Sequence, residues 1–100
     1  HKDRGLFVSF RGALAINQTK KIDQNFENPC TKCPAPCLSA CPVDAFTEAG
    51  YDVVKCKEHI SGLDISNCKS FGCNTRRACP VGADLRSFEQ SSFHMENFLG

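Results

Sequence analysis

The sequence is poor in large aromatic side chains other than Phe and has little excess charge of either sign. Its 100 residues include no Trp and one Tyr, and the 12 Lys and Arg nearly balance the 11 Asp and Glu. The formal net charge of +1 argues against a strongly basic nucleic-acid-binding protein, so we expect no nucleic-acid partner. No apolar run approaches the roughly 18–20 residues that a membrane-spanning helix needs, so we expect no membrane span.

The start of the chain also lacks a recognisable leader. The chain begins at His1 rather than at Met, and no basic stretch followed by an apolar stretch indicates a signal peptide. We therefore expect a cytoplasmic protein. We also expect the chain to be a processed or excised piece of something longer.

Cysteine is the residue that the sequence has in excess. Eight Cys stand at positions 30, 33, 37 and 41 and then at 56, 68, 73 and 79. Three uses are open: a disulfide framework, structural zinc, or iron–sulfur clusters. Neighbours two or three residues apart strain a disulfide and gain little loop entropy. Zinc knuckles usually keep Cys pairs well apart, whereas four Cys here lie within twelve residues. Spacing therefore favours iron–sulfur clusters over zinc, and zinc over disulfides.

The residues before the first cysteine predict a strand followed by a loop. Leu6, Val8 and Phe10 alternate with other residues, which predicts a short strand within residues 1–16. Residues 17–29 are mostly polar and end in a Pro, which predicts a connecting loop.

The residues after Cys41 predict a hairpin and two helical segments. The runs 45–47 and 51–54 flank Glu48-Ala49-Gly50 and predict a small hairpin. A single helical turn is expected over 56–60, ending at Gly62. The tail from Asp84 predicts a core-facing helix with a Ser87-x-x-Gln90 capping box, because apolar residues recur there at helical spacing, at Leu85, Phe88, Met95 and Leu99.

An internal repeat links the two cysteine groups. Each group ends in Ala-Cys-Pro-Val-x-Ala, at residues 40–45 and 78–83. Two similar cysteine loops in tandem predict two similar metal centres related by approximate symmetry.

The first cysteine group carries a family resemblance. Cys30-x2-Cys33-x3-Cys37-x3-Cys41-Pro42 resembles the cysteine run of bacterial two-cluster ferredoxins, which usually has two residues before the third Cys. The second group, Cys56-x11-Cys68-x4-Cys73-x5-Cys79-Pro80, keeps the order and stretches every gap. In that family the fourth Cys of a run ligates the other cluster. The resemblance therefore implies two [4Fe–4S] clusters, one held by Cys30, Cys33, Cys37 and Cys79 and the other by Cys41, Cys56, Cys68 and Cys73.

Two details near the cysteines bear on those clusters. His59, three residues after Cys56, is an alternative ligand for one iron, but eight Cys already suffice for two cubes, so we expect an ordinary polar side chain. Pro34 and Pro36 each remove a backbone N–H from the loop before Cys37, so we expect few hydrogen bonds to the sulfurs there.

These observations predict an α+β fold. We expect a small two-[4Fe–4S] ferredoxin-like domain with short hairpins and short helices, an N-terminal strand extension and a C-terminal helix extension. The expected boundaries are 1–28 for the N-terminal extension and loop, 29–82 for the two-cluster domain, and 83–100 for the C-terminal helical extension.

The function that the resemblance implies is the transfer of single electrons to a redox partner protein or an upstream cofactor domain. The sequence shows no Ser/His/Asp arrangement, phosphate-binding Gly loop or paired carboxylates, so no catalytic residue is identifiable and a carrier is favoured over an enzyme. The sequence leaves the oligomeric state open. A zinc-stabilised interaction module is one alternative.

A second alternative is an electron-feeding fragment of a larger enzyme. His1-Lys2-Asp3-Arg4-Gly5-Leu6 and Arg11-Gly12-Ala13-Leu14, followed by a two-cluster module, resemble the approach to the C-terminal part of epoxyqueuosine-reductase-like proteins. In that family a ferredoxin-type domain feeds electrons to a cobalamin-dependent site in a preceding domain.

Overall fold

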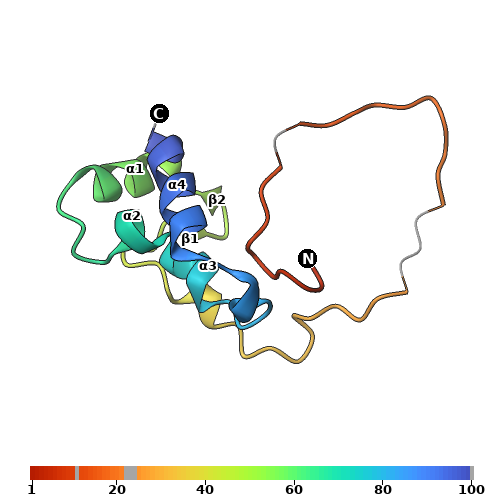
Figure 1. Ribbon diagram of the computed structural model, residues 1–100, viewed down its shortest axis with the longest axis horizontal. Helices are drawn as coiled ribbons and strands as arrows, with labels where there is room; N and C mark the ends of the chain where they lie inside the picture. The colour runs from red at the N-terminus through yellow and green to blue at the C-terminus, as the bar shows by residue number, and fades with distance from the viewer. Residues whose placement is uncertain (11, 22–24, 100) are drawn as a thin grey trace.

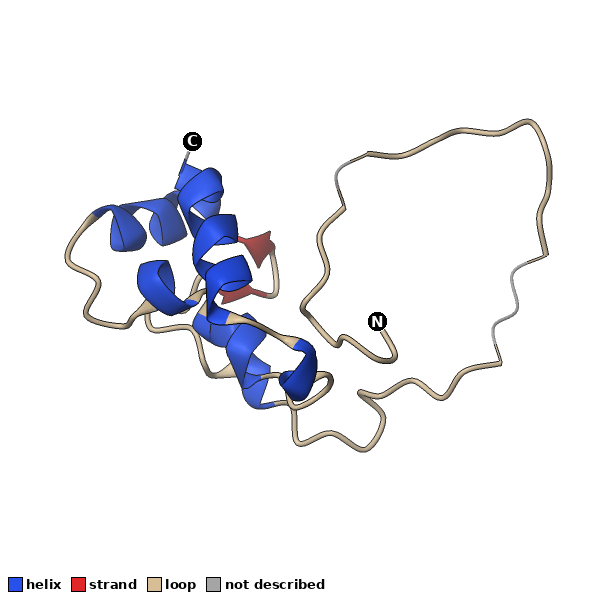
Figure 2. Cartoon of the chain, viewed as in Figure 1, coloured by secondary structure: helices blue, strands red, loops and turns tan. Residues whose placement is uncertain are grey.

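The chain forms a small mixed α+β structure. The computed structural model describes residues 1–10, 12–21 and 25–99, so Arg11 of the Arg11–Leu14 motif and the side chain of Leu99 lie outside the description. The described residues form short helices and a two-stranded sheet (Figures 1 and 2). In chain order these are η1 (Pro36–Leu38), β1 (Phe46–Thr47), β2 (Gly50–Tyr51), α1 (Val53–Ser61), α2 (Cys68–Phe71), α3 (Asn74–Ala78), η2 (Ala83–Leu85) and α4 (Phe88–Leu99).

The predicted hairpin is present and is shorter than expected. β1 and β2 are antiparallel, with Phe46 opposite Tyr51 and Thr47 opposite Gly50. Gly50 has a φ of 120°, a conformation that favours glycine and lets the chain reverse at this point.

Helix α1 takes residues that the pattern assigned to the second strand. Val53 and Val54 begin the helix because Asp52 caps it, its carboxylate accepting a hydrogen bond from the Lys55 N–H at 3.0 Å. The helix ends at Gly62 as predicted, but it covers nine residues instead of a single turn.

The core lies where three helices meet. Ile60 of α1, Cys68 of α2 and Met95 of α4 are buried together, and Cys73 and Phe98 pack against them. The C-terminal helix forms as its pattern predicted, and the Ser87 hydroxyl accepts the Gln90 N–H at 3.1 Å. Residues after 83 therefore share one core with the cysteine region.

The predicted N-terminal strand is wrong. In the described residues 1–10 and 12–16 the chain forms a turn followed by an irregular segment (Figure 2). The Gly5 N–H donates to the His1 carbonyl at 2.8 Å, which closes the turn. The Leu6 and Val8 carbonyls accept hydrogen bonds from the Arg76 side chain at 3.0 and 3.2 Å. The Arg76 guanidinium thus bonds to the two carbonyls that a neighbouring strand would otherwise use.

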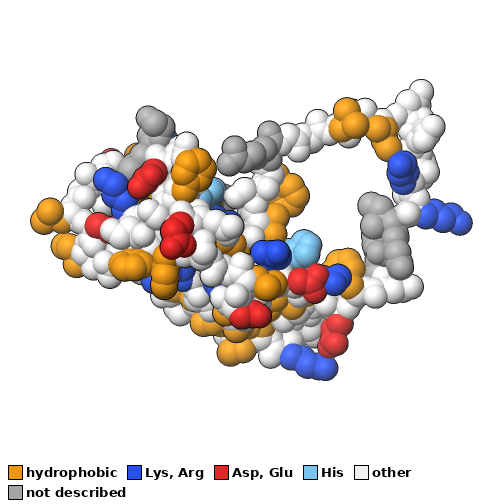
Figure 3. Space-filling model, viewed as in Figure 1, with side chains coloured by type: hydrophobic (Ala, Val, Ile, Leu, Met, Phe, Trp, Pro, Cys, Tyr) orange, Lys and Arg blue, Asp and Glu red, His pale blue; other side chains and the backbone are white. Residues whose placement is uncertain are grey.

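The connection between this segment and the first cysteine arcs away from the helices (Figure 1). Its described residues, 17–21 and 25–29, form no helix or strand, as predicted, and residues 22–24 lie outside the description. Hydrophobic side chains stand exposed on this side of the molecule (Figure 3), and in the preceding segment Phe10 and Leu14 are 91% and 87% exposed. Within the described ranges no helix has the length and apolar character to cross a membrane.

Candidate metal centres

The eight cysteines are free thiols that line two separate cavities. The outer cysteine cavity, of about 450 Å³, is lined by Cys30, Cys33, Cys37 and Cys79. The inner cysteine cavity, of about 20 Å³, is lined by Cys41, Cys56, Cys68 and Cys73. Each cavity joins three cysteines of one sequence group to one cysteine of the other. These are the two sets that the family resemblance implies as ligands, and their binding of clusters stays a prediction.

Helix α3 directs consecutive cysteines into different cavities. Cys73 precedes the helix and its carbonyl accepts the Arg77 N–H at 2.9 Å. Cys79 follows the helix and its N–H donates to the Arg76 carbonyl at 3.3 Å. The helix advances about 1.5 Å per residue, so the two cysteines lie at its opposite ends. Helix α3 also lies beside η1, which contains Cys37 of the outer set.

The internal repeat has a structural counterpart in two similar turns. After Cys41-Pro42-Val43, Asp44 has a φ of 48°, and after Cys79-Pro80-Val81, Gly82 has a φ of 67°. The residue types differ because their surroundings differ. A Cβ on Gly82 would collide with the backbone of the N-terminal turn at Asp3, so glycine is needed only in the second turn.

Arg86 fixes the main chain at Cys79. Its guanidinium donates hydrogen bonds to the carbonyls of Arg76 at 2.8 Å, Arg77 at 3.1 Å and Cys79 at 2.6 Å. Carbonyls at the C-terminal end of a helix have no partner within the helix, and a cation there also complements the helix dipole. No sequence signal indicates this role, because any long cationic side chain on the tail would look the same.

Backbone N–H groups donate to one sulfur in each cavity. The Ala35 N–H is 3.4 Å from Cys33 Sγ, and the Ala45 N–H is 3.3 Å from Cys41 Sγ. Ala35 stands between the two prolines that lack an N–H, and its φ of 53° belongs to the left-handed region. The proline-rich loop therefore still provides a donor to a sulfur, through the alanine that the prolines flank.

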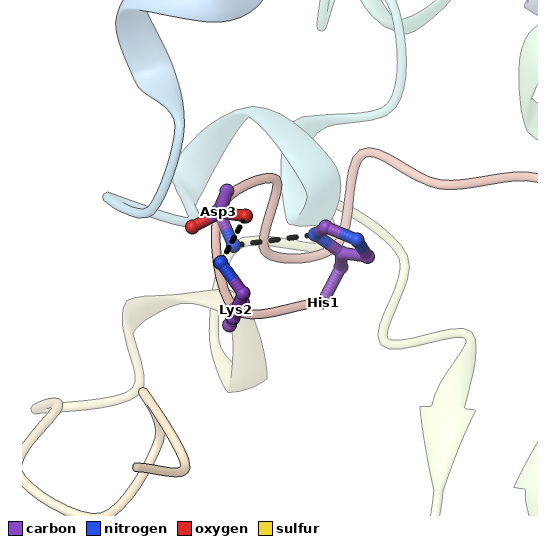
Figure 4. A network of polar contacts seen from close by, with 3 residues as sticks. All are labelled: His1, Lys2 and Asp3. Atoms are coloured by element: carbon purple, nitrogen blue, oxygen red, sulfur yellow. Dashed lines mark hydrogen bonds and ion pairs between the residues drawn. The ribbon is translucent and has the colours of Figure 1, made fainter. Parts of the chain in front are cut away.

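The N-terminal turn forms part of the wall of the outer cysteine cavity. His1, Lys2, Gly5 and Leu6 line that cavity. Within the turn, the Asp3 N–H donates to His1 Nδ1 at 3.2 Å, and Lys2 Nζ pairs with the Asp3 carboxylate at 2.6 Å (Figure 4). A Cβ on Gly5 would collide with Cys79 Sγ, so the turn lies directly against a cysteine of the outer set.

Burial and neighbouring groups shape the ionisation of the inner cysteine cavity. Burial raises the pKa of the Cys56 thiol, and a hydrogen bond from the Tyr51 hydroxyl acts in the opposite direction. Burial, followed by this bond to Cys56, raises the pKa of Tyr51. His59 also lines the cavity, and its Nε2 lies 2.7 Å from the Ser66 hydroxyl, a polar contact of the kind expected from its sequence position.

Each cavity offers four thiols, the donor set that one [4Fe–4S] cube takes. In the described part of the chain, no group of three or more His, Cys, Asp or Glu side chains is arranged to hold one metal ion. Zinc needs four donors converging on one point. In a [4Fe–4S] cube each iron takes its own terminal thiolate, so the four thiolates surround a larger body. Four thiols at each cavity match that donor set, and the inner cavity, which has room for about one water molecule, would have to widen around a cube.

Comparisons with known proteins add no relative. No protein-family model, curated protein or solved structure matches this chain. The resemblance to two-cluster ferredoxins is therefore carried by the cysteine runs, and the resemblance to epoxyqueuosine-reductase-like proteins by the N-terminal motifs.

Proposed function

We propose that this chain is an iron–sulfur electron-transfer protein or domain that carries single electrons through two [4Fe–4S] clusters. The observation that supports the proposal is the division of the eight thiols between two cavities, four to each. Each cavity takes three cysteines from one sequence group and the last cysteine of the other group. That division uses every cysteine and matches the ligand exchange typical of two-cluster ferredoxins.

The cofactors would supply reversible one-electron couples at the two cavities. The residues of this chain hold the thiolates in place and set their surroundings. The Ala35 and Ala45 N–H groups donate to sulfurs, which favours added negative charge. Arg86 holds the Cys79 main chain, and α3 stands between Cys73 of the inner set and Cys79 of the outer set along the chain.

The outer cysteine cavity is the side on which a protein partner would exchange electrons. Cys79 of the outer set is buried, as Cys68 of the inner set is, but Cys30 of the outer set is exposed, whereas the other inner cysteines are half-buried. Electron transfer between proteins needs a redox centre close to the surface, so the outer set is the more accessible one. Free thiols and iron–sulfur chemistry suit a reducing compartment, and we place the protein in the cytoplasm on that ground.

A second candidate function is the electron-feeding part of a larger epoxyqueuosine-reductase-like enzyme. The exposed apolar side chains Phe10 and Leu14 favour it, because such side chains are typical of a surface that another domain covers. The same two clusters would then deliver electrons within one enzyme.

The experiment that tests the proposal is metal analysis of protein purified without oxygen. We expect iron and acid-labile sulfide in equal amounts, a brown colour with broad absorbance at roughly 400 nm, and no stoichiometric zinc. Two matched variants test the division: Cys73→Ala should remove the inner cluster, and Cys79→Ala should remove the outer one. Stoichiometric zinc in colourless protein would contradict the proposal and favour the interaction module.

A further inference from the structure

A third cavity adjoins the inner cysteine cavity on the side of the N-terminal segment. It has a volume of about 660 Å³, within the range of about 300–1,000 Å³ that is usual for small-molecule sites. Cys56 and Cys73 line it together with Leu6, Val8 and Phe10 of the N-terminal segment. We call it the aromatic cavity. A molecule bound in it would lie against two cysteines of the inner set.

Three aromatic rings form a continuous series along this cavity. The Phe46 and Tyr51 rings are stacked, with centroids 4.8 Å apart and planes 10° from parallel. The Phe98 ring continues the series at 6.4 Å from Tyr51, tilted by 30°. Aromatic walls of this kind favour a flat, aromatic occupant, because ring faces stack in offset or tilted arrangements.

The charge of the cavity favours an occupant that accepts electrons. Arg76 lines the cavity, and no Asp or Glu is among its lining residues, all of which the structure describes. Two of the five guanidinium N–H groups bond to the carbonyls of Leu6 and Val8, which leaves three for other acceptors. The Phe7 ring lies 4.7 Å from the Arg76 guanidinium carbon. A carbonyl oxygen that becomes negative on reduction is the acceptor that such a group stabilises.

We propose that the aromatic cavity binds a quinone, a planar ring with carbonyl oxygens. The inference rests on the proposed function for the source of electrons. Reduction of a quinone to a hydroquinone takes two electrons, one from each reduced cluster, and two protons from water. Both clusters return to their oxidised state, and the carbonyl oxygens become hydroxyls. The aromatic cavity is thus the exit of the electron path.

Equilibrium titration of the oxidised, cluster-loaded protein with 2,3-dimethyl-1,4-naphthoquinone tests this proposal. Methyl groups occupy both ring carbons to which a thiol could add, which suppresses the reaction of free cysteines with the probe. Val8→Phe should fill the cavity and weaken binding about tenfold or more. Val54→Phe makes the same change at a residue that is 67% exposed and outside the cavity, and binding should be unchanged.

Three results of this titration would overturn the proposal. They are equal affinity in wild type and Val8→Phe, equal affinity for 2,3-dimethylnaphthalene (which lacks carbonyls), and tighter binding of FMN than of the quinone. Iron and sulfide analysis of the same samples separates two failures. A protein that carries both clusters but binds no quinone overturns this inference alone, whereas a protein without iron overturns the proposed function as well.

Discussion

The outer and inner cysteine cavities have the same number of thiols and are built from different parts of the chain. The inner cavity lies among helices, and Ile60 and Met95 of the core contribute to its wall. The outer cavity lies among turns and is partly closed by the N-terminal turn. The difference shows that similar cysteine motifs can rely on different support. The inner set is held by the packed core, and the outer set by local hydrogen bonds and a covering segment.

Removal of iron should have the largest effect and should reach both cavities. Buried hydrophobic residues of the described chain are few, and two of them are cysteines: Ala45, Ile60, Cys68, Cys79 and Met95. So small a core leaves much of the stability to the clusters and their thiolate bonds. We expect an iron chelator or oxidation to unfold residues 29–82, measured by circular dichroism. A cooperative melt retained by the iron-free protein would contradict this.

Truncation of the core should weaken the inner cavity in particular. Ile60 is 2% exposed, and Ile60→Ala should lower the free energy of unfolding by about 2–5 kcal/mol. Ile65→Ala makes the same change at a side chain that is 84% exposed and serves as the control. Anaerobic urea unfolding followed by circular dichroism measures both. Equal costs in the two variants would show that the core does not support the inner set.

A methyl group on the N-terminal turn should affect the outer cavity alone. In Gly5→Ala the added Cβ would meet Cys79 Sγ at a φ of 54°, and the left-handed conformation alone costs about 1–2 kcal/mol. We expect the outer cluster to be lost faster to a chelator, while the inner cluster keeps its rate. Gly12→Ala, whose Cβ meets no atom within 4 Å, is the control. If Gly5→Ala lost both clusters at the same rate, the two cavities would not be supported separately.

The loop before Cys68 should show a modest effect that depends on pH. Slight burial acts to raise the pKa of Asp64, but hydrogen bonds from the Ser70 hydroxyl and from the N–H groups of Lys69 and Ser70 outweigh it and lower the pKa. Because the pKa of Asp64 is lower in the folded than in the unfolded protein, its contribution to stability is present above the ordinary carboxyl pKa. That contribution is lost as the pH falls through the pKa of the folded state. Asp64→Asn should cost about 0.5–1 kcal/mol at neutral pH, because it weakens charge-assisted hydrogen bonds that solvent partly screens, and the cost should shrink in acid. Unfolding of both proteins across pH tests this, and a cost independent of pH would contradict it.

The smallest expected effect is a gain in stability at the outer cavity. Ala35 has a left-handed φ of 53° and still donates its N–H to Cys33 Sγ. Ala35→Gly keeps that N–H and removes the steric cost of the Cβ, about 1–2 kcal/mol. Because glycine also raises the entropy of the unfolded chain by about 0.4–1 kcal/mol, the net gain in stability should be about 0.5 kcal/mol. Melting temperature measures the gain. A decrease would mean that the loop depends on the alanine side chain.

The sequence predicted the elements whose signals are local. The hairpin at Phe46–Tyr51 and the helix Phe88–Leu99 follow from turn residues and from helical spacing. Helices α2 and α3 were missed, because four or five residues are too few to show a period. The N-terminal strand was predicted wrongly, because its carbonyl partner is Arg76, a residue about seventy positions away.

The candidate site was likewise predictable only where its signals are local in the sequence. The cysteines and their pairing into two sets came from motif spacing and family resemblance. The roles of Arg76, Arg86 and Gly5 were not predictable, because they act through backbone carbonyls or through close approach. Contacts of this kind depend on the folded path of the chain and leave no pattern in composition or spacing.

Native mass spectrometry of the anaerobically purified protein tests the central claim most directly. The account predicts one dominant species, the chain with two [4Fe–4S] clusters, and in Cys79→Ala a dominant species that has lost the outer cluster and keeps the inner one. A wild-type mass equal to the chain alone, or to the chain with zinc ions, would contradict it.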